Sequence, residues 1–443
     1  MKFSDFKINT PLRNAIADMN IETPTLIQER AFPVIMSGKD MVGIAQTGTG
    51  KTIAYLLPAL QQWSFSKNKT PQILVIVPTR ELVMQVVEEV KKLTAYMNVV
   101  TVGIYGGANI KTQSKTVYQG VDVLVATPGR LYDIMMLGVL RFKQLKKLII
   151  DEIDEMMNLG FRHQLVNIID ALPQKRQNLM FSATLTKDVE DFINNYFYNP
   201  QKIEAAPSGT PLKDIIQSAY SVPNYYTKVN LLKHLLNTDD AFSKVLVFVV
   251  SKKMADKLFE DINGDYPEKI GVIHSNKAQN NRFNTVRKFH DGTYRVVIAT
   301  DIVARGIDIS EVSHVINFDI PEVPENYIHR IGRTGRADKK GNAISFITES
   351  DLGKVANIEG LMKQTIPVSD LPQEVEVSEK LLPEEMPTAH LKEIEMRRPK
   401  REVGAAFHEK KEKNKKTRIK ITRAQQMREK YGKPKTKRPK RKR

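Results

Sequence analysis

The feature that most constrains this chain is a series of short apolar runs, each of them continuous rather than alternating. They are rich in β-branched residues and lie at 73–79, 121–128, 148–152 and 179–184, and then again at 244–250, 271–274, 294–301 and 314–319. A continuous apolar run indicates a strand buried on both faces, as in a parallel sheet covered by helices. Because the series stops and restarts, we predict an α/β fold of two tandem domains with parallel sheets.

Composition and length place the domain boundaries. A chain of 443 residues is too long for one ordinary core. The stretch AAPSGTPLKD carries two prolines and a glycine and is typical of a short linker. After about residue 370 the chain turns to Pro, Glu and Lys, a composition that cannot bury enough surface to fold alone. We therefore predict domains at 1–206 and 215–370, a linker at 207–214 and a disordered basic tail at 371–443.

The positive charge is concentrated at one end of the chain. Residues 397–443 contain 22 Lys and Arg against 4 Asp and Glu, whereas the remaining 46 basic residues (68 − 22) are balanced by 46 acidic ones (50 − 4). The whole net charge of +18 therefore lies in the last stretch. A neutral body with a basic tail favours a polyanionic partner, most often nucleic acid. The alternative is a solvated end that only keeps the protein in solution.

Several classes of protein are excluded by residue counts. The chain has no cysteine, so it has neither disulfides nor thiol nucleophiles, and its 8 scattered histidines do not favour a zinc site. No apolar run approaches the roughly 18 residues that span a bilayer. The start, MKFSDFKINT, lacks the apolar segment of a secretory signal. We expect a cytoplasmic protein, or a nuclear one if the source has a nucleus, with no membrane partner.

The first motif that indicates chemistry is AQTGTGKT, residues 45–52. It fits the phosphate-loop pattern except that Ala45 replaces the first glycine. Gly48 and Gly50 let backbone N–H groups surround an anion, Lys51 reaches the β- and γ-phosphates, and Thr52 can bind Mg²⁺. A glycine turn without a ligand is the alternative. The predicted nucleotide-binding residues of this loop are Ala45, Gln46, Thr47, Gly48, Thr49, Gly50, Lys51 and Thr52.

The second motif is LIIDEIDEMM, in which acidic residues directly follow a buried strand. With a triphosphate bound nearby, Asp151 at the strand's end is placed to hold Mg²⁺, together with Thr52. Glu152 is then placed to orient or deprotonate the water that attacks the γ-phosphate. Alone, such a run would be read as the acidic start of a helix. The phosphate-loop motif about a hundred residues upstream favours the catalytic interpretation.

The third motif, HRIGRTGR at 329–336, lies in the second predicted domain. Arg333 and Arg336 are three residues apart and, if they face the nucleotide, can stabilise charge at the γ-phosphate in the transition state. A solvated basic loop is the alternative. Its occurrence in the second of two α/β domains favours the catalytic role.

Taken together, these motifs resemble those of the DEAD-box RNA helicases of superfamily 2, whose fold is two RecA-like domains. The resemblance runs from Phe3 to about Thr348. The family's blocks occur here in order: TPTLIQ ending at Gln28, AQTGTGKT, PTREL (78–82), Gly106-Gly107, TPGR (127–130), DEID (151–154) in place of DEAD, SAT (182–184), FVVSK (248–252), Gln279 with Arg282, ATDIVARGID (299–308) and HRIGRTGR.

The resemblance also implies roles for residues outside the three motifs. It implies that Gln28 reads the adenine edge with Phe3 packed behind it, and that Asp308 meets ATP from the second domain. Ser182 and Thr184 would couple the nucleotide site to RNA. The implied RNA-backbone contacts are Pro78, Thr79, Arg80, Gly107, Thr127 and Arg130 in the first domain and Gln279, Arg282, Thr300 and Asp301 in the second. RNA held in this way needs no base recognition.

Two positions depart from the family pattern. Ile153 stands where the family usually has Ala, so we expect a compensating small neighbour rather than lost activity. Ile21 stands where many members have an aromatic residue beside adenine, which keeps apolar packing but removes stacking.

The resemblance implies an ATP-dependent RNA helicase, an RNA-stimulated ATPase that uses ATP and Mg²⁺. ATP and RNA together would close the two domains and open a few base pairs locally. A DNA translocase of the same superfamily and a non-catalytic RNA clamp or assembly scaffold are the rivals. The sequence of the RNA substrate, its pathway and any protein partner are not indicated by the motifs.

Overall fold

The structure of the chain is a computed structural model. It describes residues 2–46, 48–67, 70–205, 215–238, 241–301, 309, 312–335, 341–386, 430 and 432, without the side chains of residues 279 and 280. Of the residues singled out in the sequence, Thr47, Asp308, Arg336, the side chain of Gln279, the linker at 207–214 and nearly all of the basic tail lie outside this description. No helix within the described ranges is both long and apolar enough to cross a membrane.

Two seven-stranded sheets confirm the predicted α/β class, and every strand pair in them is parallel. The first sheet has the order β3-β4-β2-β5-β6-β1-β7. Its strands are β1 (Met41–Ile44), β2 (Ile73–Ile76), β3 (Thr101–Ile104), β4 (Val123–Ala126), β5 (Lys147–Asp151), β6 (Gln177–Ser182) and β7 (Gln201–Glu204).

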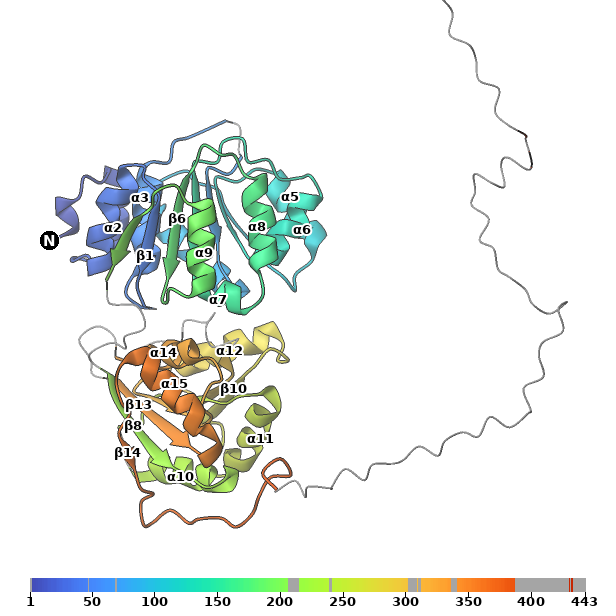
Figure 1. Ribbon diagram of the computed structural model, residues 1–443. Helices are drawn as coiled ribbons and strands as arrows, with labels where there is room; N and C mark the ends of the chain where they lie inside the picture. The colour runs from blue at the N-terminus through green and yellow to red at the C-terminus, as the bar shows by residue number, and fades with distance from the viewer. Residues whose placement is uncertain are drawn as a thin grey trace, which may run out of the picture. The chain divides into compact units, whose positions relative to one another are not determined.

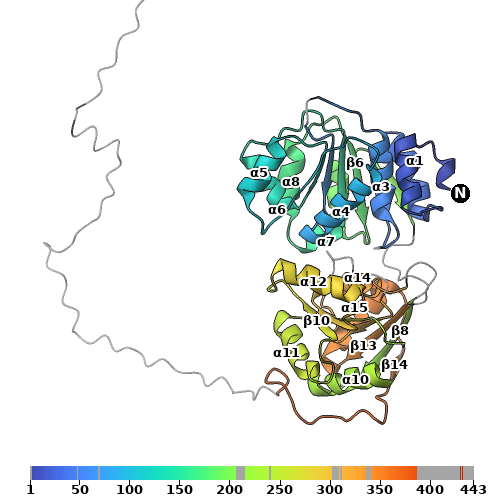
Figure 2. The same ribbon diagram turned by 180° about the vertical axis from the view of Figure 1, so that it is seen from behind.

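Helices cover both faces of the first sheet. Figure 1 shows α8 and α9 on the near face, and the view from behind in Figure 2 shows α3 and α4 on the other. The helices of this domain are η1 (Phe3–Asp5), α1 (Thr10–Asp18), α2 (Leu26–Met36), α3 (Lys51–Gln61), α4 (Arg80–Leu93), α5 (Ile110–Tyr118), α6 (Pro128–Met136), α7 (Ile153–Asn158), α8 (Arg162–Ala171) and α9 (Lys187–Tyr196).

The two faces explain why the apolar runs are continuous. In β2, Ile73 and Val75 belong to the core on the side of α1–α4, whereas Leu74 and Ile76 belong to the core on the opposite side. Successive strand residues point to opposite faces, so a strand covered on both sides needs apolar residues throughout.

The second sheet repeats the topology of the first. Its order, β10-β11-β9-β12-β13-β8-β14, is the order of the first sheet when its strands are counted from β8. The strands are β8 (Ile215–Ser221), β9 (Val245–Phe248), β10 (Ile270–Ile273), β11 (Val296–Ala299), β12 (His314–Asn317), β13 (Gly341–Ile347) and β14 (Val368–Ser369). The helices are α10 (Tyr225–Thr238), α11 (Lys252–Asn263), α12 (Gln279–His290), α14 (Pro324–Ile331), η2 (Glu349–Asp351) and α15 (Leu352–Met362).

The second domain extends beyond the boundary expected at residue 370. Residues 371–386 pack on it: Val375 is 6% exposed within its core, and the Asn224 Nδ2 donates to the Ser378 carbonyl at 2.6 Å. The Glu385 carboxylate accepts from the Tyr225 N–H at 2.7 Å. The sequence suggested a tail here because the stretch is rich in Pro and Glu, but a few apolar side chains and polar contacts to α10 attach it to the domain, and the compact unit ends at Met386.

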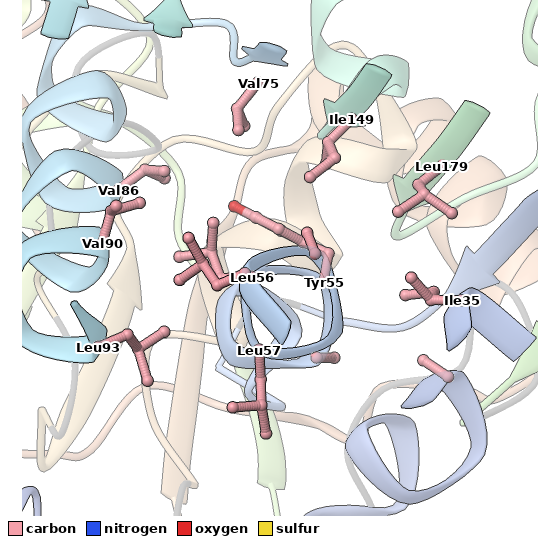
Figure 3. Close-up of a cluster of buried hydrophobic side chains, with 14 of the residues drawn as sticks. Ile35, Tyr55, Leu56, Leu57, Val75, Val86, Val90, Leu93, Ile149 and Leu179 are labelled. Atoms are coloured by element: carbon pink, nitrogen blue, oxygen red, sulfur yellow. The ribbon is translucent and has the colours of Figure 1, made fainter. Parts of the chain in front are cut away.

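Packing of α3 fixes the position of the phosphate loop that precedes it. Figure 3 shows Tyr55, Leu56 and Leu57 of this helix among side chains from α4 and from the strands, including Val86 and Ile149. All five are at most 2% exposed. Because α3 begins at Lys51, this core holds the first turn of the helix against the sheet.

The departure at Ile153 generates a stability prediction. Ile153 is fully buried in the core that contains Leu148 and Ile150. We expect Ile153→Ala, although it restores the residue usual in the family, to lower the free energy of unfolding by about 2–5 kcal/mol, because it leaves a cavity. Urea denaturation measures this, with Leu137→Ala as the control, since Leu137 is 57% exposed. A stability equal to that of the parent chain would show that the neighbours close around the smaller side chain.

Candidate functional site

The loop between β1 and α3 has the geometry of an anion cradle. Gly48 and Gly50 have φ of +82° and +84°, a left-handed conformation that L side chains rarely adopt. The Ala45 N–H donates to the Ser182 carbonyl at 3.0 Å, which ties the start of the loop to β6. The first N–H groups of α3 have no acceptor within the helix, and the helix dipole makes this end positive. The loop therefore presents a site for phosphate at the carboxyl end of β1.

Lys51 supports this assignment independently. Its side chain is 6% exposed, and its Nζ lies 3.8 Å from the Asp151 Oδ1, too far for a hydrogen bond. The ammonium makes no hydrogen bond to any described group. An ammonium has three donors, and a buried charge without acceptors is costly. The residues present thus fit a bound phosphate, which would supply the missing acceptors.

Gln28 joins the same loop to α2. Its Oε1 accepts from the Thr25 N–H at 2.9 Å in a capping box, and its Nε2 donates to the Gly50 carbonyl at 3.1 Å. Phe3 is 6% exposed, with its ring 5.7 Å from that of Phe6. Ile21 packs, partly buried, on the same core. The structure therefore brings Gln28 to the phosphate loop, while the contact with adenine stays a prediction.

A sharp strand-to-helix turn presents the acidic residues. β5 ends at Asp151, α7 begins at Ile153, and Glu152 between them has the left-handed φ of 53°. For a residue other than glycine, this backbone conformation is less stable by roughly 1–2 kcal/mol of free energy. The Glu152 N–H donates to the Asp151 Oδ1 at 3.0 Å, which fixes that carboxylate at the end of the strand. Both side chains are buried beside Lys51.

Burial dominates the titration of both carboxyls. It raises the pKa of Asp151 above its ordinary value, against the opposing charge of Lys51. It raises the pKa of Glu152 to about 7, and the charges of Lys51 and Arg333 again oppose the shift. Arg333 belongs to the second domain and is 4% exposed. The second domain thus contributes a positive charge to the environment of Glu152.

The residues present also fit Mg²⁺. No group of three or more His, Asp or Glu side chains in the described ranges could hold a metal ion by itself. Mg²⁺ commonly binds through one or two protein ligands and completes its shell with phosphate oxygens and water. Thr52, in the first turn of α3, and Asp151 match that donor set.

Asp154 connects this site to the segment Ser182–Thr184. Its Oδ2 accepts from the N–H and the hydroxyl of Thr184 at 3.0 and 2.9 Å, and the Ser182 hydroxyl donates to the Thr184 carbonyl at 2.7 Å. The same Oδ2 lies 3.7 Å from the Nε2 of His329 in α14. Burial would raise the pKa of Asp154, but His329, Lys51 and Thr184 hold it below its usual range. Both Asp154 and His329 lie in the sequence motifs, but the spacing of the motifs did not predict which residues they contact.

A second buried network supports the HRIGRTGR segment. Arg330 is 1% exposed and forms a two-pronged ion pair with Asp301, at 2.5 Å from its Nε and 2.9 Å from its Nη2. Its Nη1 donates to the Asp319 carbonyl at 2.6 Å. Thr300, next to Asp301, is buried. Asp301 was expected near RNA; its carboxylate here holds Arg330, and hence the turn that carries Arg333.

The predicted RNA residues of the first domain converge on one edge of its sheet. They follow the carboxyl ends of β2, β3 and β4, which are neighbours in the sheet. Two of them have intramolecular roles. The Thr79 hydroxyl caps α4 by accepting from the Leu82 N–H at 3.3 Å, and the Arg130 Nη1 donates to the Ala108 carbonyl at 2.9 Å. Arg130 therefore supports the loop that contains Gly107, whose φ is +81°. Pro78 and Thr127 are buried at the same edge.

Glu81 joins the predicted RNA residues of the two domains. Its Oε1 lies 3.0 Å from the Arg80 Nε and 2.9 Å from the Nη1 of Arg282, which belongs to α12. The side chains of Glu81 and Arg282 are only 7% and 9% exposed. The motif PTREL contains Glu81, but the sequence analysis assigned this residue no role. Glu81 is the residue directly after Arg80, which was predicted to contact RNA phosphate. A carboxylate beside such an arginine is the feature of the sequence that could have identified it.

The chain is similar to known proteins over most of its length. Residues 25–192 match the family model described as DEAD/DEAH box helicase, and residues 227–338 match the helicase conserved C-terminal domain. The chain is 37% identical over 362 residues to a DEAD-box ATP-dependent RNA helicase, CshA, of Geobacillus kaustophilus, which covers 82% of this chain and 77% of that protein. It is 35% identical over 379 residues to the ATP-dependent RNA helicase DbpA of Bacillus subtilis, with 85% and 78% covered.

A solved structure shows the same fold. S. cerevisiae Dbp5 bound to RNA and ADP BeF3 matches with a TM-score of 0.76 and 28% identity, over 84% of this chain and 96% of that one.

The phosphate loop generates a binding prediction. A Cβ at Gly50 would lie 2.4 Å from the Gln28 Nε2, in addition to the left-handed φ. We expect Gly50→Ala to weaken ATP binding at least about tenfold. A loss of about 1.4 kcal/mol of binding free energy, caused by strain in the phosphate loop, gives a tenfold change in Kd. Titration with a fluorescent ATP analogue measures it.

Gly138→Ala is the matched control, because Gly138 also has a left-handed φ, +69°, but no atom within 4 Å of its added Cβ. Equal ATP affinity in Gly50→Ala and the control would mean that the loop does not hold the phosphates.

Proposed function

The chain belongs to the DEAD-box family, and from this premise we propose how its residues perform the reaction of an ATP-dependent RNA helicase. The family hydrolyses ATP in response to RNA, and its members named above are RNA helicases. The observation that carries the residue assignment is the Lys51 ammonium, which is buried next to Asp151 without a hydrogen-bond acceptor.

ATP binds with its phosphates in the loop Ala45–Thr52. The backbone of the loop and Lys51 hold the β- and γ-phosphates. Gln28, with Phe3 packed behind it, contacts the adenine, and Asp308 contacts ATP from the second domain. Thr52 and Asp151 hold Mg²⁺, which neutralises phosphate charge when bound.

Glu152 acts on the attacking water. Burial raises the pKa of Glu152, and a carboxylate with a raised pKa is a better proton acceptor. The turn at Glu152 aims its carboxylate beside Lys51, where the γ-phosphate would lie. Arg333 and Arg336 stabilise the charge that develops on that phosphate. The influence of Arg333 on Glu152 supports this assignment.

RNA binding is coupled to hydrolysis through Asp154. This carboxylate contacts the Ser182–Thr184 segment of the first domain and His329 of the second. A shift of either domain changes its surroundings, and through the short helix α7 it is linked to Glu152. Closure of the domains around ATP and RNA would therefore bring the catalytic residues into position. Hydrolysis would then release the RNA.

The RNA backbone lies across the carboxyl edge of the first sheet and the facing residues of the second domain. Arg80 and Arg282 are the charged phosphate contacts, and Glu81 holds both in place. N–H and hydroxyl groups for the RNA come from Thr79, Gly107 and Thr127. Arg130 holds the loop that contains Gly107 through its hydrogen bond to the Ala108 carbonyl. Gln279, Thr300 and Asp301 belong to the second-domain side, with Asp301 acting through Arg330. Contacts of this kind favour RNA without reading its sequence.

The alternative functions require different residues and different nucleic acids. A non-catalytic RNA clamp would not need Lys51, Glu152 and Arg333 buried around one site. Comparison of ATPase stimulation by RNA and by DNA separates a helicase on RNA from a DNA translocase. The cytoplasmic location stays a prediction.

The basic tail acts as an RNA anchor. Its residues 397–443 hold the entire net charge of +18, and its two aromatic residues, Phe407 and Tyr431, offer little base stacking. Its binding is therefore electrostatic, and it raises the local concentration of RNA at the catalytic body.

The assignment of Glu152 has a direct test. We expect Glu152→Gln to leave ATP affinity nearly unchanged and to lower the RNA-stimulated rate about 10²-fold or more, because the amide cannot take up the proton. The exposed Glu88→Gln is the control for loss of one carboxylate in this domain. A variant that keeps more than half of the parent rate would remove Glu152 from the mechanism.

The tail has a separate test. We expect a chain that ends at Met396 to keep its ATPase rate at saturating RNA but to need more RNA to reach half of it. Its affinity should also depend less steeply on salt, because fewer counterions are released. The readout is ATPase activity against RNA concentration at several salt concentrations. If both quantities match those of the full chain, the tail serves a protein partner or a localisation signal instead.

A further inference from the structure

The edge of the first sheet opposite to the ATP and RNA residues is hollowed. Two adjoining hollows of about 730 and 980 Å³ share Gly38 and Arg176 in their linings. They lie where β2, β5, β6, β1 and β7 begin, and these five strands are consecutive in the sheet. Strands are about 4.8 Å apart, so the hollows follow roughly 19 Å of this edge. We call this surface the amino-edge groove.

Cations dominate the amino-edge groove. Its basic side chains are Lys39, Lys143, Lys146, Lys175 and Arg176. None of the five forms an ion pair with a carboxylate in the part of the chain that the structure describes.

Two carboxylates, Asp40 and Asp170, line the groove against five cations, and both act on the charge of Arg176. Asp40 is 8% exposed and accepts from the Asn178 N–H at 2.7 Å, the Asn178 Nδ2 at 3.0 Å and the Tyr198 N–H at 3.0 Å. Asp170 is exposed. The groove is therefore positive, although residues 1–396 together carry no net charge.

Exposed aromatic rings accompany these cations. Phe65 is 68% exposed in the first hollow, and Tyr198 is 90% exposed in the second. Aromatic rings beside cations are the pattern on which single-stranded nucleic acid stacks its bases.

The structure beneath the groove shows that positive charge is crowded there. Lys147 begins β5 and is 4% exposed, with its ammonium hydrogen-bonded to the Gln177 Oε1. Burial and the neighbouring Lys146 lower the pKa of Lys147 to about 8. An anion bound in the groove would relieve this repulsion.

We propose that the amino-edge groove is a second RNA site, which binds a single-stranded segment of the same RNA whose neighbouring part occupies the carboxyl edge. The two edges lie at opposite ends of the strands, so only an RNA longer than the core path reaches both. The groove holds phosphates through its lysines and stacks bases on Phe65 and Tyr198. It keeps a long substrate attached while the two domains open and close.

The test compares a short and a long RNA on the full chain. The variant carries Lys143→Gln, Lys146→Gln and Lys175→Gln, all exposed positions that remove charge without disturbing a core. The control carries Lys7→Gln, Lys91→Gln and Lys253→Gln, which are exposed and outside the groove. The short RNA has about 10 nucleotides, within the range that one binding site covers, and the long RNA is several times longer.

With the long RNA, we expect the variant to need several-fold more RNA than the control for half-maximal ATPase activity, at an unchanged maximal rate. Its log-log salt slope should be shallower by about 2, because three phosphate contacts on single-stranded RNA contribute about 0.7 each. With the short RNA, variant and control should agree. Ultraviolet crosslinking of the parent chain should join the long RNA to the peptide that contains Phe65, and Phe65→Ala should abolish that crosslink.

Two results would overturn the proposal. If variant and control behave alike with the long RNA and Phe65 does not crosslink, the groove is a solvated face or the site of an acidic protein. If the variant loses the short RNA equally, its lysines act on the core path and no second site exists. Neither result bears on Glu152 or Lys51, so hydrolysis is tested separately.

Discussion

The arrangement of the proposed active site depends on one buried ammonium, that of Lys51. It lies beside two carboxyls whose pKa values burial raises, yet no hydrogen bond satisfies it. A buried cation of this kind is stable only if the fold holds it rigidly and an anion completes its surroundings. The core around α3 provides the rigidity, and the phosphate loop provides the place for the anion. Nucleotide binding is therefore built into the packing of the first domain.

Buried polar contacts join the two domains in the part of the chain that the structure describes. Asp154 contacts Thr184 and lies near His329, while Glu81 lies between Arg80 and Arg282. Charged contacts of this sort are geometrically demanding and gain little free energy when imperfectly made. Contacts of this kind suit the opening and closing of the domains proposed above.

The sequence predicted the parts of this molecule that depend on local pattern. Continuous apolar runs predicted eight buried strands, and AQTGTGKT predicted the turn with its left-handed glycines. It missed the other six described strands. β1 and β3 are only four residues long, β7 and β14 lie at sheet edges, and β8 and β13 contain polar residues among the apolar ones. The pairing of Asp301 with Arg330 was also missed, because it joins residues 29 positions apart. Contacts that exist only after the chain folds leave no periodic signal.

The proposed mechanism requires that Arg333 of the second domain takes part in ATP hydrolysis at the first domain. The rate of RNA-stimulated ATP hydrolysis by Arg333→Ala, measured with ATP affinity and with Arg333→Lys beside it, tests this most directly. We expect Arg333→Ala to lower the rate about 10³-fold or more with little change in ATP affinity. Arg333→Lys should recover only part of the rate, because it keeps the charge but loses the planar fork. A rate for Arg333→Ala within a few-fold of the parent would contradict the account.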